Sequence, residues 1–294
     1  MAAPAGDLST LESVAVAAAD AWGLPAPALL RLGMNAIYAA GDDVVLRVSR
    51  PNGPPRSAIA LAGALLGAGL TVPRPVRDEP FVRGDVAVFA IERLHANGDP
   101  IDWPRVGAMV RSLHTLGRSM FPAEYPCPRG TSFPWWDLDG LLAGTGSAID
   151  DVALASMRAC LDRHRGTVAA SRDAPSVVCH GDVHPGNVVQ TASGPVLLDW
   201  DLLCREPAGW DHAPLMTWTE RWGGPPGVYE AFAAGYGRDL THDRFAAAFA
   251  ELRLLAATLM RVRAGLTDPS AAAEAQRRLR WWRGDPDAPP WTAA

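Results

Sequence analysis

The sequence predicts an α+β fold, with short strands gathered near the N-terminus and helices filling most of the remainder. Three apolar runs, at residues 29–32, 36–40 and 44–48, are separated by turns rich in Gly, Asn and Asp, which is typical of strands. A second β pattern lies at residues 187–199. Helical spacing of apolar residues marks the segments 55–69, 103–117, 148–170, 228–236, 243–264 and 270–282. The proline-containing tail from residue 284 is expected to be loosely ordered.

Composition and charge exclude several classes of protein. The hydrophobic content of 48% and the charged content of 20% are those of a soluble globular chain. A net charge of −5 argues against nucleic acid as a partner. The longest uncharged apolar run, at residues 58–70, is too short to cross a bilayer. The four cysteines are scattered, without metal-ligand spacing, so a cytoplasmic protein is expected. The oligomeric state stays open.

The most informative stretch begins at His180, after the short β-branched run 177–179. His180 therefore lies where a buried strand gives way to a loop. Asp182 and Asn187 follow on that loop, and the intervening Pro and Gly at 185–186 prevent a helix between them.

A hairpin is expected to follow, with strands at 187–190 and 195–199 and a four-residue turn at 191–194. Pairing Gln190 with Pro195 would place Asn187 opposite Leu198, beside Asp199. The sequence thus predicts that an amide oxygen and a carboxylate meet at the open end of this hairpin.

This set of residues suits phosphoryl transfer from a nucleotide. Mg²⁺ prefers carboxylate and amide oxygens, which Asn187 and Asp199 would supply. Asp182 would be the base that accepts a hydrogen bond from the attacking hydroxyl. An alternative is a metal-dependent hydrolase, in which His180, Asp182 and His184 bind a metal. The Pro and Gly that follow favour a loop, which makes this alternative the weaker one.

The motif HGDVHPGN at residues 180–187, followed by LDWD at 198–201, resembles the aminoglycoside phosphotransferase and choline kinase family. That family has the bilobal fold of protein kinases. The resemblance implies a small β-rich N-terminal lobe, residues 1–94, which binds the nucleotide. It also implies a larger, mostly helical C-terminal lobe, residues 95–294, which carries the catalytic and acceptor-binding residues. The implied cofactors are Mg²⁺ and ATP, or GTP.

The resemblance also assigns residues to nucleotide binding. The turn Gly33-Met34-Asn35 would fold over the phosphates, and Arg47 stands where the family has its strand-three cation. Glu92 and Leu94 fall at the hinge, where family members hold the base through backbone groups.

One departure from the kinase pattern concerns the partner of Arg47. Kinases hold this cation with a Glu from the next helix. Here the corresponding position is near Ala58, and residues 44–77 contain no Asp or Glu. Arg47 is therefore expected to pair with phosphate directly and to be held, if at all, by a carboxylate from elsewhere, such as Asp199.

The acceptor leaves a weaker signal. Aromatic side chains beside carboxylates suit an amine-bearing sugar or a quaternary amine, through stacking and cation–π contact. The candidates are Trp135, Trp136, Asp137, Trp218 and Glu220. The alternative is that these tryptophans pack between helices. His180 and Asp211 are expected to support the catalytic loop, as the resemblance implies.

We therefore expect a small-molecule kinase that transfers the terminal phosphate of ATP or GTP to a hydroxyl group. An aminoglycoside or amino-sugar-like acceptor is the first choice, and a choline-like or macrolide kinase is the second. A nucleotide-binding pseudokinase that acts as a scaffold is an alternative of another class, which the intact Asp182, Asn187 and Asp199 argue against.

Overall fold

The computed structural model describes residues 5–33 and 35–292. The chain forms two compact units, and both are discontinuous in sequence. The first unit contains Met1–Asp102, Gly117–Pro126 and Val188–Asp201. The second contains Trp103–Leu116, Cys127–Asn187 and Leu202–Ala294. The predicted α+β class is confirmed, with a small antiparallel sheet in the N-terminal region and a larger helical C-terminal part.

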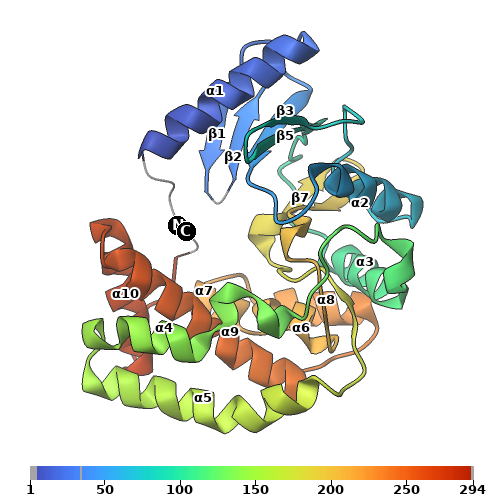
Figure 1. The fold of residues 1–294 in the computed structure, drawn as a ribbon. Helices are drawn as coiled ribbons and strands as arrows, with labels where there is room; N and C mark the ends of the chain where they lie inside the picture. Colours follow the sequence, from blue (N-terminus) through green and yellow to red (C-terminus); the bar gives the residue numbers. More distant parts are fainter. Residues whose placement is uncertain (1–4, 34, 293–294) are drawn as a thin grey trace. The chain divides into compact units, whose positions relative to one another are not determined.

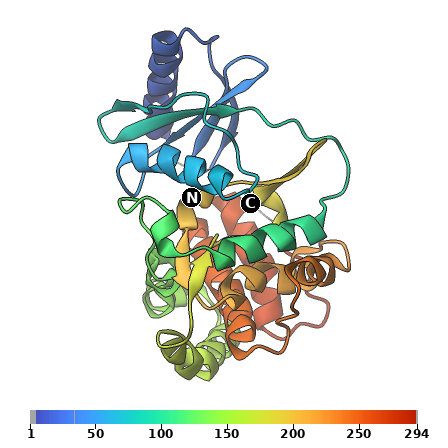
Figure 2. The same cartoon turned by 90° about the vertical axis from the view of Figure 1, so that its right-hand side faces the viewer.

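The first unit is built on a five-stranded antiparallel sheet with the strand order β1-β2-β3-β5-β4. Helix α1 packs on one face of this sheet and α2 lies at the other (Figures 1 and 2). Alternate residues of a strand face opposite sides, so Leu46 and Val48 pack against α1 while Arg47 points away from it. The elements are α1 (Ala5–Trp22), β1 (Ala28–Leu32), β2 (Ala36–Ala39), β3 (Val44–Ser49), α2 (Pro55–Gly67), β4 (Phe81–Arg83) and β5 (Val86–Glu92).

The hairpin of β7 (Val188–Thr191) and β8 (Gly194–Leu197) belongs to the first unit, although it lies far along the sequence. Its register confirms the predicted pairing of Gln190 with Pro195. The predicted four-residue turn is wrong, because Thr191 pairs with Gly194 and the loop is shortened to residues 192–193. Gly194 has a φ of +122°, which a glycine adopts readily.

Backbone hydrogen bonds attach this hairpin to the rest of the first unit. The Leu197 amide donates to the Thr71 carbonyl at 3.0 Å, and the Asn97 amide donates to the Gln190 carbonyl at 3.0 Å. The sequence predicted two lobes, residues 1–94 and 95–294, which meet at a single boundary. That division stays a prediction, and the contacts in the structure group residues 188–201 with the N-terminal sheet.

The second unit is mainly helical, and α9 lies at its centre in contact with α4, α5, α6 and α10 (Figure 1). Asp243 caps α9 by accepting hydrogen bonds from the amides of Phe245 and Ala246. The helices are α3 (Trp103–Thr115), α4 (Leu138–Thr145), α5 (Asp151–Ser171), α6 (Gly209–Met216), α7 (Trp218–Trp222), α8 (Val228–Tyr236), α9 (Arg244–Gly265) and α10 (Pro269–Trp282), and the strands are β6 (Val177–Cys179) and β9 (Cys204–Glu206).

The C-terminal tail corrects the expectation of loose order. The Trp291 side chain is 2% exposed, and its backbone amide donates to the Arg221 carbonyl at 2.6 Å. Arg278 stacks over the Trp291 ring at 5.2 Å and donates to the Thr292 carbonyl at 2.9 Å. The tail is therefore part of the packing of the second unit. Across residues 5–33 and 35–292, no helix is both long and apolar enough to cross a membrane.

Candidate active site

The loop after β6 is shaped by a glycine that no other residue could replace without distortion. β6 pairs with β9 up to Cys179, and the chain then turns at Gly181, which has a φ of +99°. A Cβ atom on Gly181 would lie 2.0 Å from the Leu202 carbonyl oxygen. This close backbone approach presents Asp182 at the head of the loop, before the 3₁₀ turn Pro185–Asn187.

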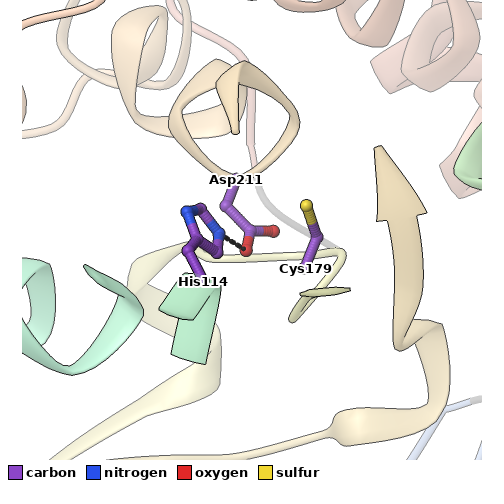
Figure 3. Close-up of side chains that lie close together, drawn as sticks. All are labelled: His114, Cys179 and Asp211. Carbon is purple, nitrogen blue, oxygen red and sulfur yellow. Dashed lines mark hydrogen bonds and ion pairs between the residues drawn. The ribbon is translucent and has the colours of Figure 1, made fainter. Parts of the chain in front are cut away.

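Asp211, on α6, forms hydrogen bonds with the backbone of this loop. Its carboxylate is fully buried and accepts hydrogen bonds from the amides of His180 and Gly181, both at 2.8 Å. His114 Nε2, from α3, lies 3.0 Å from the same carboxylate, and the two side chains point toward one another beside Cys179 (Figure 3). Asp211 therefore holds the backbone at the start of this loop.

The His114–Asp211 pair is ionised. Burial by itself would lower the pKa of His114, but the hydrogen bonds and charges of Asp211 and Cys179 together outweigh it and raise that pKa to about 9. The protonated ring also donates from Nδ1 to the Tyr236 hydroxyl at 2.9 Å. Burial would raise the pKa of Asp211, but His114 lowers it below its ordinary value. A buried carboxylate is therefore neutralised by an imidazolium.

His180 is fully buried, and its Nδ1 accepts a hydrogen bond from the Asp182 amide at 3.2 Å. Within the described residues, two clusters have side chains that could hold a metal: His114 with Cys179 and Asp211, and Cys160 with His164 and Glu251. Neither contains His180 or His184, the ligands that a hydrolase would need. In the second cluster Arg163 already pairs with Glu251 at 2.5 Å.

Asp182 is surrounded by groups that favour its carboxylate form. Its Oδ1 lies 3.2 Å from Arg253 Nη1, and its Oδ2 lies 3.4 Å from His184 Nε2. His184 Nδ1 accepts from the Gly186 amide at 3.1 Å, so the ring proton resides on Nε2, facing Asp182. Burial would raise the pKa of Asp182, but the hydrogen bond from His184 and the charge of Arg253 lower it to about 2. The side chain is still 31% exposed, so a substrate can reach it.

Asn187 is held by the same loop. Its amide nitrogen donates to the Asp182 carbonyl at 3.0 Å and lies 3.4 Å from Asp182 Oδ2. This orientation turns the nitrogen toward Asp182, and the amide oxygen is the atom that suits a magnesium ion.

The DWD segment lies in the first unit, where it meets Arg47. Asp199 has a φ of +58°, the one positive φ that a non-glycine residue adopts in the described part of the chain. Such strain is found mainly where function requires it. Arg47 Nη2 donates to Asp201 Oδ2 and lies 3.8 Å from Asp199 Oδ1. Asn35 also donates to Asp201, at 3.4 Å. The nearest carboxylate to Arg47 is thus Asp201, with the expected Asp199 farther away.

Ala58, near the position predicted for a kinase's helix Glu, lines a cavity of about 110 Å³ with Arg47. The Arg47 guanidinium lies over the Phe89 ring at 5.9 Å. Arg47 therefore faces the interior of the first unit between α2 and β5.

The remaining residues predicted to bind the nucleotide form local contacts within the first unit. The Gly33 amide donates to the Asn35 carbonyl at 3.0 Å, which closes a tight turn; Met34 lies outside the described residues. The Glu92 carboxylate accepts from the Arg74 amide at 3.0 Å, and Leu94 follows β5, partly buried. Their binding roles stay predictions.

The residues predicted for the acceptor have different surroundings. Trp136 is 6% exposed, and its ring centroid lies 4.7 Å from that of Trp210. Asp137 caps α4, because its carboxylate accepts a hydrogen bond from the Gly140 amide at 3.1 Å. These contacts favour the packing alternative for this pair. Trp218 instead stacks on His184, with ring centroids 5.9 Å apart.

Trp135 and Glu220 complete the set. The Arg253 guanidinium carbon lies 5.3 Å from the centroid of the Trp135 ring. Because Arg253 also contacts Asp182, Trp135 is connected to Asp182 through this arginine. Glu220 is 79% exposed and lies 3.7 Å from Arg221 Nη2. Arg253 itself has no motif around it, and the sequence offered no signal for its role.

The fold and the loop define a phosphotransferase of the kinase-like type, and comparison with known proteins agrees. Residues 34–255, well over half of the chain, match the sequence model of the phosphotransferase enzyme family. The chain belongs to this family, which confirms the predicted resemblance and enzyme class. No curated protein sequence matches the chain.

Several solved structures share the fold at low identity. The GDP and kanamycin complex of APH(2")-IIia superposes with a TM-score of 0.70 at 14% identity, covering 90% of this chain and 94% of that one. Aminoglycoside phosphotransferase APH(3'')-Id from Streptomyces rimosus, with ADP and streptomycin, gives 0.57 at 22%, covering 85% and 98%. A choline/ethanolamine kinase family protein from Mesorhizobium loti gives 0.61 at 19%, covering 90% and 88%.

Proposed function

We propose that this protein is a small-molecule kinase that transfers the terminal phosphate of ATP or GTP to a hydroxyl of an aminoglycoside or amino-sugar-like acceptor. The observation that carries the proposal is the ionised Asp182 on a loop whose backbone is fixed by the buried Asp211. A carboxylate presented in this way can orient an incoming hydroxyl.

Asp182 acts as the base in this reaction. The acceptor hydroxyl donates a hydrogen bond to its carboxylate while the hydroxyl oxygen bonds to the terminal phosphorus. The bond from phosphorus to the bridging oxygen breaks, and the nucleoside diphosphate leaves. Because the pKa of Asp182 is about 2, the proton moves to it only as the new bond forms and the hydroxyl becomes acidic.

Asn187 and Asp199 are the residues proposed to hold Mg²⁺. Their amide and carboxylate oxygens are the hard donors that this ion prefers, and the amide nitrogen of Asn187 is already engaged by the Asp182 carbonyl. When bound, the ion neutralises charge on the nucleotide phosphates.

The first unit is proposed to bind the nucleotide through Gly33, Asn35, Arg47, Glu92 and Leu94. The support is strongest for Arg47 and Asn35, because both converge on Asp201. A guanidinium offers a planar fork that can share its donors between this carboxylate and phosphate oxygens.

The acceptor class rests on the surroundings of Asp182. Trp218 stacks on His184, which itself faces Asp182, so an aromatic surface lies close to the proposed base. Such a surface suits sugar rings and also cationic amines. A choline-like or macrolide kinase therefore stays the second candidate. The four free cysteines are consistent with the proposed cytoplasmic location.

Nucleotide turnover tests the proposal. MgATP and MgGTP would be supplied with kanamycin, streptomycin, a macrolide, choline or ethanolamine, and release of diphosphate measured. We expect turnover with an amine-bearing sugar, and we expect Asp182→Asn to lower it by roughly 10²–10⁴-fold with little change in nucleotide affinity. Nucleotide binding without turnover of any acceptor would instead identify a pseudokinase. Full activity in Asp182→Asn would show that Asp182 is not the base.

A further inference from the structure

Arg253 reaches from α9 to the loop that carries Asp182. Its Nη1 donates to Asp182 Oδ1 at 3.2 Å, and its Nη2 donates to the Gly181 carbonyl. The Arg253 side chain is only 12% exposed. A guanidinium so far from water is costly unless it is paired, and here its partners are two consecutive residues of the loop.

Two aromatic rings pack against the Arg253 guanidinium. Its central carbon lies 4.7 Å from the Trp210 ring centroid and 5.3 Å from that of Trp135. Trp210 is fully buried and packs on Phe249, so this support belongs to the core of the second unit. Arg253 therefore has little freedom to move, and neither has the carboxylate oxygen that it contacts.

The two oxygens of Asp182 consequently differ. Oδ1 is occupied by Arg253. Oδ2 has two long contacts, at 3.4 Å from His184 Nε2 and 3.4 Å from Asn187 Nδ2. At that length both contacts are weak, and an incoming hydroxyl can replace them.

We propose that Arg253 is a positioning residue, which fixes the Asp182 carboxylate so that Oδ2 receives the acceptor hydroxyl. This inference rests on the proposed function, since it assigns Asp182 the same task. It also gives Trp135 a different task from the predicted one: the ring supports Arg253 and does not contact the acceptor.

The test compares variants of the full chain by ADP release from MgATP, with kanamycin, streptomycin or choline as acceptor. Arg253→Met keeps the length of the side chain and removes its charge. We expect it to lower kcat by roughly 10²-fold, because small displacements of a reacting group are costly. The KM for ATP should stay within about twofold of wild type, since no nucleotide contact is lost. Arg253→Lys should recover part of kcat, because it restores the charge without the fork.

Two further variants make the result specific. Arg263→Met changes an exposed arginine of the same helix and should leave kcat and KM unchanged. In an Asp182→Asn background, Arg253→Met should cost almost nothing more, because the group that it positions is already absent. If Arg253→Met does not fold, Arg253→Lys carries the test, with an expected loss of roughly tenfold in kcat at unchanged KM for ATP.

Retention of wild-type kcat by Arg253→Met, while Asp182→Asn is inactive, would overturn the inference and leave the proposed function intact. Equal losses from Arg253→Met with and without the Asp182 carboxylate would also overturn it. Wild-type activity in Asp182→Asn would instead refute the proposed base, and the role of Arg253 would fall with it.

Discussion

At the residue scale, three charged side chains of the site each have a partner of opposite charge within hydrogen-bonding distance. Asp211 is paired with His114, Asp182 with Arg253, and Arg47 with Asp201. The His114–Asp211 pair is buried, so removing one member would leave the other uncompensated in a poorly solvated place, which is strongly destabilising.

The His114–Asp211 pair predicts how stability changes with pH. The pKa of His114 is raised from 6.5 to about 9 on folding, so its contribution to stability is complete below pH 6.5 and is lost as the pH rises through 9. We expect the free energy of unfolding, measured in urea, to fall across this interval in wild type and to stay flatter in His114→Gln.

Two other buried groups titrate below that interval. The pKa of Asp211 is lowered, so its contribution is lost only in acid, and that of His212 is lowered to about 4. The pKa of the Cys179 thiol is raised well above its ordinary value by burial. Parallel pH profiles for wild type and His114→Gln would therefore mean that His114 is neutral.

At the scale of single elements, the sequence predicted well where local signals were strong. The bounds of α8 and the pairing of Gln190 with Pro195 were predicted correctly, because helical spacing and turn residues are local properties. Helix α4 and strand β9 were missed, since a short helix capped by Asp137 and a three-residue strand leave little periodicity.

The candidate site likewise contains residues that the sequence could predict and residues that it could not. Asp182, Asn187 and Asp199 were predicted from two short motifs, at residues 180–187 and 198–201. Arg253 could not be found, because its partner lies 71 residues away and α9 reads as an ordinary buried helix. The same holds for Asp201, the carboxylate that pairs with Arg47. Both contacts depend on tertiary packing alone.

The loop after β6 predicts a sharp effect of one substitution. Gly181→Ala should lower the free energy of unfolding by more than about 2 kcal/mol, because the left-handed backbone is unfavourable and the new Cβ meets the Leu202 carbonyl. Gly166→Ala is the matched control. Gly166 lies in α5 with open space around its Cα, so this change should stabilise by about 0.5–1 kcal/mol. Thermal unfolding of both variants would show whether the loop tolerates a side chain.

At the scale of the whole molecule, the C-terminal tail contributes to the second unit more than its composition indicates. Trp291 is 2% exposed and contacts Trp222 and Trp281. Trp291→Ala should lower the free energy of unfolding by about 3 kcal/mol through the lost burial and the cavity left behind. Met260→Ala, at a side chain that is 38% exposed, should change it by about 0.5 kcal/mol or less. Equal urea midpoints for these two variants would contradict the role given to the tail.

The chain passes between the two units five times, after residues 102, 116, 126, 187 and 201. Recombination between related genes joins one contiguous stretch of sequence to another, so a single crossover in this region would divide a unit between two parents. Arg47 could then come from one parent and Asp201 from the other, although they form one ion pair. Inheritance would therefore couple the N-terminal sheet, which ends at Glu92, to a hairpin that begins only at Val188. Chimeras of such genes should be viable mainly when the two segments come from the same parent.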